Sequence, residues 1–165
     1  MPNYCDCELK LEGPCGDLDQ IEKMWGGRKG LPRNENRRSG DDSRRPDLDI
    51  FNHIVPMPKD IDLHEEYPPG GMPQWFNWRV ENWGTKWEPS EVEVKRKKLK
   101  EMKITFNTAW SPPCPIIIVL GRMFPKVVFK LKYYDGLGGF KGYFEVAKSE
   151  VTVDETSKYH GKRGG

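Results

Sequence analysis

Residues 92–110, VEVKRKKLKEMKITFNTAW, contain two runs in which apolar and polar side chains alternate. Val92 and Val94 lie on the apolar side of the first run, and Met102 and Ile104 begin the apolar side of the second. Such alternation is typical of strands with one buried face, and the charged residues between the runs suit a turn. The stretch therefore predicts a β-hairpin in which Val92 lies beside Ile104 and Val94 lies beside Met102.

Extension of this pairing beyond the hairpin brings together two stretches that are rich in tryptophan. Glu88 is expected opposite Thr108, and Lys86 is expected near Trp110. The two stretches would then form one structure at the end of the sheet, and we call this structure the joint. It consists of residues 82–87 (NWGTKW) and residues 108–113 (TAWSPP). The glycine would permit a turn with positive φ, and the lysine could lie across a tryptophan ring.

The remaining strands and helices follow from the periodicity of the apolar residues. Residues 5–11 alternate like a half-buried strand, whereas Leu18 and Trp25 fall on one face of a helix that Asp17 would cap. We predict strands at residues 5–11, 48–55, 127–133 and 140–147, and helices at residues 17–25, 74–83 and 115–124. Pro115 suits the first turn of the last helix.

This order of elements predicts an α+β fold of ferredoxin-like type, with helices on one face of a mainly antiparallel sheet and extra hairpin and loop insertions. We expect one domain over residues 1–151, because a single core usually serves roughly 100 to 200 residues. Residues 26–47 are polar and rich in arginine, so we expect a flexible connection there. Residues 152–165 are expected to be a frayed polar tail.

Composition gives no overall electrostatic preference, since 27 basic and 25 acidic residues leave a net charge of +2. The longest apolar run, residues 115–120, is far shorter than the ~20 residues of a membrane span, and the N-terminal residues lack a signal pattern. We therefore expect a cytoplasmic protein that does not insert into a membrane. Its four cysteines are then expected to be free thiols rather than a disulfide framework.

Four of the six tryptophans lie within residues 75–87, and the chain could use them in two ways. A cluster of tryptophan and proline at the end of a sheet is more often core and rim than recognition surface, and we favour that structural interpretation for most of the rings. Tryptophan is also enriched at the energetic centres of protein interfaces, so at least one ring should be left to face a partner. The candidate binding residues are Trp75, Trp78, Trp83, Lys86, Trp87 and Trp110.

Basic residues cluster at 28–45, 95–103 and 158–163, which raises the alternative of nucleic-acid binding. The candidate phosphate contacts are Arg37, Arg38, Arg44, Arg45, Lys97 and Lys98. Acidic residues interrupt the first cluster, and the low net charge weakens this hypothesis further. Residues 141–143 (KGY) match the start of an RNA-recognition strand, but Glu145 stands where a second stacking aromatic would be needed.

Two groups of residues contain potential metal ligands. Cys5, Cys7, Cys15 and Cys114 could supply four thiolates, but the one-residue gap on a strand points the first two toward the core. Residues 60–66 carry several carboxylates and a histidine on a segment without a rigid element, so we expect a solvated acidic loop. The sequence therefore predicts no metal and no cofactor.

Several short motifs match a known family: NYC at residues 3–5, PMP at 56–58, both stretches of the joint, FP at 124–125 and GFKG at 139–142. With these motifs the chain resembles the YubB ferredoxin-like domain family of phage and plasmid proteins, over nearly its whole length except residues 26–47 and the tail. The resemblance implies a ferredoxin-like fold and a mobile-element origin. The family has no assigned reaction, so the resemblance implies no catalytic residue.

These observations favour a non-enzymatic interaction protein of a phage or plasmid that binds a host protein, with a host defence protein as a reasonable target to inhibit. The alternative from another class is a nucleic-acid-binding accessory protein that uses the basic loops. A small metal-dependent or nucleotide-processing enzyme is a third hypothesis, but the sequence has no glycine-rich phosphate loop, nucleophile elbow or HExxH pattern. We therefore expect no catalytic residues.

Overall fold

The computed structural model describes residues 3–26 and 49–159 of the chain. Its strands are β1 Tyr4–Glu12, β2 Ser90–Lys98, β3 Glu101–Ala109, β4 Val128–Asp135, β5 Phe140–Ala147 and β6 Glu150–Lys158. Its helices are α1 Cys15–Trp25, α2 Phe51–Ile54, α3 Gln74–Trp83 and α4 Cys114–Met123. The strands form one sheet in the order β2-β3-β1-β4-β5-β6, and every neighbouring pair is antiparallel.

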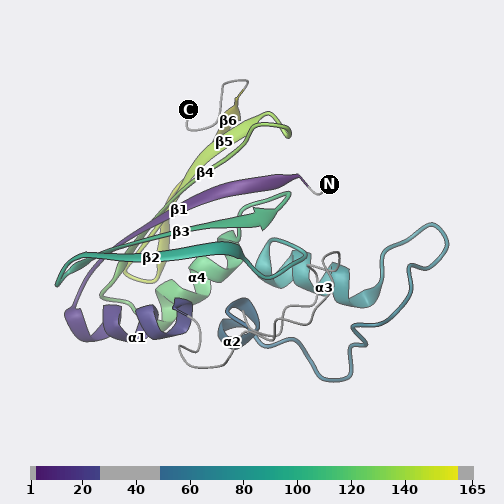
Figure 1. The fold of residues 1–165 in the computed structure, drawn as a ribbon, viewed down its shortest axis with the longest axis horizontal. Coiled ribbons are helices and arrows are strands. Elements are labelled where there is room, and N and C mark those ends of the chain that lie inside the picture. Colours follow the sequence, from purple (N-terminus) through teal and green to yellow (C-terminus); the bar gives the residue numbers. More distant parts are fainter. Residues whose placement is uncertain (1–2, 27–48, 160–165) are drawn as a thin grey trace, which may run out of the picture.

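Four of these strands have the arrangement of a ferredoxin-like fold. β3 lies between β1 and β2, α1 precedes β2, and α4 connects β3 to β4, which pairs with the other edge of β1. The helices α2 and α3 are inserted between α1 and β2, while β5 and β6 extend the sheet beyond β4. Figure 1 shows α1 and α4 on one side of the sheet. The prediction of a ferredoxin-like α+β fold with insertions is therefore confirmed.

The core lies between the sheet and these helices. Cys5, Cys7, Leu9 and Leu11 of β1 are all buried, as their alternation in the sequence predicts. Burial raises the pKa of the Cys7 thiol well above its usual value, so this thiol is neutral at physiological pH. In residues 3–26 and 49–159, no three metal-ligating side chains come together, and no helix is long and apolar enough to cross a membrane.

The predicted strand at residues 48–55 is wrong, because the short helix α2 occupies this region. Ile50, Phe51 and Ile54 are buried on one side of this turn of helix, which is helical rather than strand spacing. The backbone N–H groups at its start are bound by Glu88, which lies 37 residues farther along the chain than Phe51. A local pattern could not reveal a helix whose cap comes from so far away.

The β2–β3 hairpin is present, but its register differs by two residues from the predicted one. Val94 pairs with Ile104 instead of Met102, and the hairpin is closed by a two-residue turn at residues 99–100. The register also shifts between Ser90 and Glu93. β2 begins only at Ser90, so Glu88 precedes it and does not pair with β3.

Two other expectations are wrong at the ends of elements. Residues 150–158 form β6, which pairs with β5 along its length, so most of the predicted tail belongs to the sheet. β6 carries few apolar residues, and nearly all of its side chains are exposed, which explains why its sequence looks like a tail. The predicted Asp17 cap is also wrong, since α1 begins at Cys15 after Pro14 and has no side-chain cap.

Candidate functional site

The joint exists and is held by hydroxyl groups that bond to the backbone. The Thr85 hydroxyl donates to the carbonyl oxygen of Ala109 at 2.8 Å, and the Ser111 hydroxyl donates to that of Gly84. The Thr108 hydroxyl donates to the carbonyl oxygen of Ser111 at 2.7 Å, which fixes the turn after β3. These bonds tie the end of α3 to the end of β3, as the sequence predicts.

Gly84 is required at this position for two physical reasons. Its φ is +80°, a left-handed conformation that ends α3 and that other residues adopt only with strain. A β-carbon at this position would lie 2.7 Å from Cδ of Pro115 and 2.8 Å from the carbonyl oxygen of Pro112. The two stretches therefore approach too closely for any side chain at residue 84.

Trp83 forms the inner side of the joint and belongs to the core. Its side chain is 0% exposed, and its indole N–H donates to the carbonyl oxygen of Val55 at 2.9 Å. The rings of Phe51 and Trp78 meet it edge to face at 6.0 and 5.9 Å between centroids. The prediction that Trp83 can bind a partner is thus wrong, because this ring has no surface to offer.

A line of aromatic rings runs along the outer side of the joint, and we call it the aromatic rim. It consists of Tyr67, Trp75, Phe76 and Trp110, with successive centroid distances of 6.4, 5.9 and 6.5 Å. Each neighbouring pair meets edge to face, a favourable arrangement for aromatic rings. Tyr67 is 60% exposed and Trp110 is 46% exposed, so both ends of the rim face solvent.

Trp110 combines an exposed ring with an unusual backbone. Its φ is +68°, which is rare for a bulky residue and costs roughly 1–2 kcal/mol. Its N–H donates to the carbonyl oxygen of Asn3 at 2.9 Å, and the Asn3 side chain in turn donates to the Asp135 carboxylate. The residue before β1 and the last residue of β4 thus help to hold Trp110 in its strained conformation.

Lys86 lies beneath the Trp110 ring, as the sequence predicts. Its side-chain nitrogen Nζ is 3.7 Å from the centroid of Trp110 and 4.3 Å from that of Trp87. Lys86 is only 8% exposed, and its burial lowers the pKa of the ammonium group. The predicted contact between Lys86 and Trp110 is confirmed.

Arg79 is a second cation at the joint, and the sequence reasoning missed it. Its guanidinium carbon lies 4.7 Å from the ring centroid of Trp83 and 5.5 Å from that of Trp75. One guanidinium nitrogen, Nη1, donates to the carbonyl oxygen of Lys86 at 3.3 Å. Trp75, Arg79 and Trp83 are spaced four residues apart on α3, so helical spacing could have shown that the arginine lies between two rings.

Glu88 connects the joint to α2. Its carboxylate accepts the backbone N–H groups of Ile50, Phe51 and Asn52 at 3.0, 2.7 and 2.8 Å. Burial raises the pKa of Glu88 to about 7, against the opposing effect of these N–H groups. Glu88 also lines a hollow of about 740 Å³, together with Met57, Trp75, Arg79, Trp87 and other residues.

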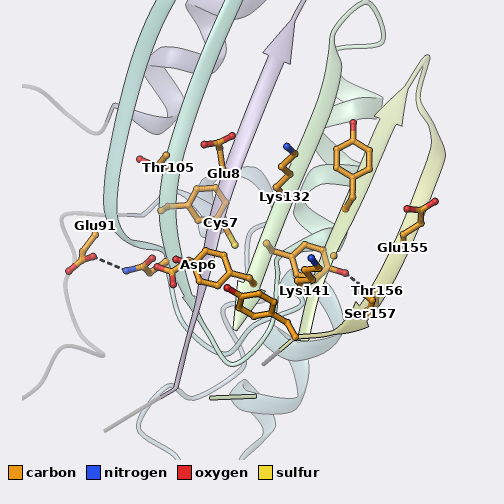
Figure 2. A pocket seen from close by; sticks show the side chains of 17 residues that line it. Asp6, Cys7, Glu8, Glu91, Thr105, Lys132, Lys141, Glu155, Thr156 and Ser157 are labelled. Atoms are coloured by element: carbon orange, nitrogen blue, oxygen red, sulfur yellow. Dashed lines mark hydrogen bonds between the residues drawn. The ribbon is translucent and has the colours of Figure 1, made fainter. Parts of the chain in front are cut away.

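The face of the sheet opposite the core carries a second hollow, of about 1010 Å³. Figure 2 shows that side chains from β1, β4, β5 and β6 line it. The strand register places Glu8, Lys132, Tyr143 and Glu155 in one row across these four strands. Four acidic side chains, Asp6, Glu8, Glu91 and Glu155, line this hollow with two lysines, Lys132 and Lys141, so acidic groups predominate.

Most lysines of the same face are already neutralised. Register brings Lys95, Lys103, Lys10 and Lys130 into one row, and each of them forms an ion pair with a glutamate at 3.2 to 3.5 Å. Within the described residues, Lys132 has no ion pair, and Lys141 contacts only the ring of Tyr159 at 5.5 Å. A polyanion would find little uncompensated positive charge here.

The other predicted contacts are distributed as follows. Trp75, Trp78 and Trp87 are half-buried, and Trp78 packs against the core. Lys98 ends β2 and pairs with Glu101 at 3.5 Å. Arg37, Arg38, Arg44, Arg45 and the side chain of Lys97 lie outside what the structure describes. The KGY residues lie on β5, an inner strand between β4 and β6.

The acidic segment at residues 60–66 has a structural use in this part of the molecule. Its Glu65 carboxylate accepts the backbone N–H of Gln74 at 2.7 Å and so binds the start of α3. The Asp62 carboxylate accepts the N–H of His64 at 2.8 Å within the loop. Glu65 thus helps to position the helix that carries Trp75 and Arg79.

Comparison with known proteins supports the fold and places the joint within a known domain. Residues 82–162 match the family model described as the ferredoxin-like domain in Api92-like protein. The crystal structure of protein api92 from Yersinia pseudotuberculosis is similar, with a TM-score of 0.68 and 10% sequence identity over 98% of this chain and 99% of that chain. No curated protein matches the sequence. The fold is therefore ferredoxin-like, and residues 82–162 resemble the domain found in Api92-like proteins.

Proposed function

We propose that the protein is a non-enzymatic interaction protein that binds another protein through the aromatic rim. The observation that carries this proposal is Trp110, whose ring is 46% exposed although its backbone is strained at φ +68°. Glycine or asparagine would adopt this backbone at lower cost. Strain of this kind is found preferentially at functional sites, and exposed tryptophan is enriched at the centres of protein interfaces.

The exposure and packing of the four rings in the aromatic rim support a protein partner over a small molecule. Tyr67 and Trp110 are exposed at its two ends, while Trp75 and Phe76 between them are half-buried. Rings locked edge to face lose little freedom when a partner covers them, so they contribute much contact area at low entropic cost.

The resemblance to the YubB family of phage and plasmid proteins supports a more specific proposal. A protein of a mobile element acts inside a host cell, so its partner is expected to be a host protein. A host defence protein, bound and inhibited through the rim, is the target that fits this origin.

Nucleic-acid binding is the weaker alternative. The row of lysines on the described part of the sheet is paired with glutamates, which leaves Lys132 and Lys141 as the cations of the adjacent hollow without an ion pair among the described residues. The predicted arginine contacts lie outside the described residues. A metal-dependent enzyme has less support still, because no group of three metal-ligating side chains occurs in residues 3–26 and 49–159.

A tagged pull-down from host-cell extract, with and without nuclease, tests the proposal. We expect the wild type to retain a protein partner after nuclease treatment and in high salt, whereas phosphate contacts lose affinity steeply with salt. Trp110→Gly should lose this partner without loss of the fold. Leu99→Ala is the matched control, since Leu99 is 75% exposed at the opposite end of β3 and should not affect capture.

Partner recovery that disappears with nuclease would support the nucleic-acid alternative. Equal capture by the wild type and Trp110→Gly would show that the rim is not the binding site.

A further inference from the structure

Lys86 is a largely buried cation beside the rim whose Nζ still reaches solvent. The residue is 8% exposed, and within the described residues Nζ has no hydrogen bond or ion pair, but it is not among the fully buried polar atoms without a partner. Its neighbours are the ring faces of Trp110, Trp87 and Phe76, at 3.7, 4.3 and 6.0 Å from Nζ. An ammonium group has three donors, and buried charges are normally paired.

The charged side chains Glu88 and Arg79 near the joint are engaged elsewhere. The carboxylate of Glu88 is turned to α2, where it accepts three backbone N–H groups. Arg79 lies over the rings of Trp75 and Trp83 and donates to the Lys86 carbonyl oxygen. Within the described residues, the contacts of Nζ are therefore ring faces, which replace a hydrogen-bond acceptor incompletely.

The position of Lys86 at the rim makes it accessible to a partner. Trp110, the ring closest to Nζ, is itself half exposed and stands at the end of the aromatic rim. A group that approaches Trp110 from solvent would thus reach the ammonium beside its ring. The surrounding aromatic rings would exclude water from such a contact and so strengthen it.

We propose that Lys86 binds a carboxylate of the protein partner, with Trp87 and Trp110 as the aromatic walls of the site. This inference rests on the proposed function of the rim and names the chemistry that the rim recognises. The carboxylate accepts hydrogen bonds from Nζ, while an apolar side chain next to it in the partner packs on the Trp110 ring. The partner segment is therefore an acidic residue flanked by apolar residues.

The electrostatics of Lys86 agree with this assignment. Burial lowers the pKa of its ammonium group. A carboxylate within about 4 Å favours the charged form and would raise this pKa again. Binding of the acidic group and protonation of Lys86 should therefore support each other.

The test uses the full chain and two short peptides, acetyl-Leu-Glu-Leu-amide and acetyl-Leu-Gln-Leu-amide. Indole N–H signals are followed by NMR during titration, and the Trp110 signal is assigned by its absence in Trp110→Gly. We expect the glutamate peptide to shift the Trp110 and Trp87 signals in a saturable way. The glutamine peptide should bind at least about ten-fold more weakly, because it lacks the charge.

Two variants separate the charge from the shape of the side chain. Lys86→Met keeps the length but removes the ammonium and should abolish the preference for glutamate, whereas Lys86→Arg should retain part of it. Equal shifts with both peptides, no shift with either, or an unchanged glutamate preference in Lys86→Met would overturn the proposal. If Lys86→Met does not fold, the relative affinities of the wild type for the two peptides still test the proposal.

These results can be distinguished from those that test the rim itself. If Trp110→Gly loses the captured partner while Lys86→Met retains it, the rim is the binding surface and the carboxylate proposal is wrong. If neither variant affects capture, the proposed function is wrong as well.

Discussion

The inner side and the outer rim of the joint use the same residue type in opposite ways. Trp83 is fully buried, ends a regular helix and donates its indole N–H to a backbone carbonyl. Trp110 is half exposed and has a left-handed backbone, and its ring lies against the ammonium group of Lys86. The inner ring thus has all its interactions within the chain, whereas the outer ring leaves a surface for others.

This difference shows why a motif alone does not identify a binding site. NWGTKW and TAWSPP contain residues that tie α3 to β3, such as Gly84, Thr85 and Ser111, next to residues that line a surface. A protein that resembles this domain could keep the first group for its fold and change the second with its partner. Mutations should therefore divide the joint into a structural part and a binding part.

The largest effect is expected from Trp83→Ala on the inner side. Removal of a fully buried tryptophan typically lowers the free energy of unfolding by about 3–5 kcal/mol, because a cavity remains and the burial is lost. Denaturant unfolding measures this loss. Trp75→Ala on the rim is the comparison and should cost clearly less, since its ring is half-buried. A similar loss of unfolding free energy in both variants would show that the inner side and the rim of the joint do not differ in their contribution to stability.

Gly84→Ala should destabilise the fold by roughly 2–4 kcal/mol. About 1–2 kcal/mol comes from the positive φ, and the clash of the new methyl group with Pro115 and the Pro112 carbonyl adds to this. Gly70→Ala is the matched control, because Gly70 has a φ of +75° but no atom near the position of a β-carbon. Equal losses in the two variants would mean that the close approach at the joint contributes nothing.

The pH dependence of stability should reveal Glu88. Its pKa is about 7 in the fold and near 4.5 when unfolded, so the folded state binds more protons between these values. The contribution of Glu88 is therefore fully present below about pH 4.5 and declines as the pH rises to 7, by up to about 3 kcal/mol. Denaturant unfolding from pH 4.5 to 8 in wild type and Glu88→Gln isolates this slope.

The Glu88→Gln variant cannot ionise at this position, so its stability should lack that decline. The same slope in both proteins would show instead that the three backbone N–H groups keep the Glu88 pKa low.

The smallest effect concerns the backbone of Trp110. Trp110→Ala and Trp110→Gly both remove the ring, but only glycine relaxes the positive φ, so the alanine variant should be about 1 kcal/mol less stable. Thermal unfolding of the two variants gives the difference. An alanine variant as stable as the glycine variant would mean that the strain at this position is negligible.

The outline of the fold could be predicted from the sequence because its signals are local. The alternation in β1, the hairpin residues and Pro115 at the start of α4 all act within a few positions. α2 and β6 could not be predicted in this way. α2 depends on the distant Glu88 cap, and β6 depends on β5 to pair with it.

The candidate site could be predicted only in part. The hairpin brought Lys86 to Trp110 even though its register was two residues off, since a shift of two keeps the same face of the strand. Which tryptophan stays exposed could not be predicted, because Trp83 and Trp110 differ through packing and backbone conformation. Neither the packing nor the backbone conformation of a tryptophan can be read from the composition or from residue spacing.

The affinity of Trp110→Gly for the captured partner, measured beside its free energy of unfolding, tests the central claim most directly. The rim predicts at least about a 30-fold loss of affinity, as expected for an interface tryptophan, with the variant still folded and cooperative in unfolding. Affinity within about two-fold of the wild type, in a variant that folds normally, would contradict the assignment of the aromatic rim as the binding surface.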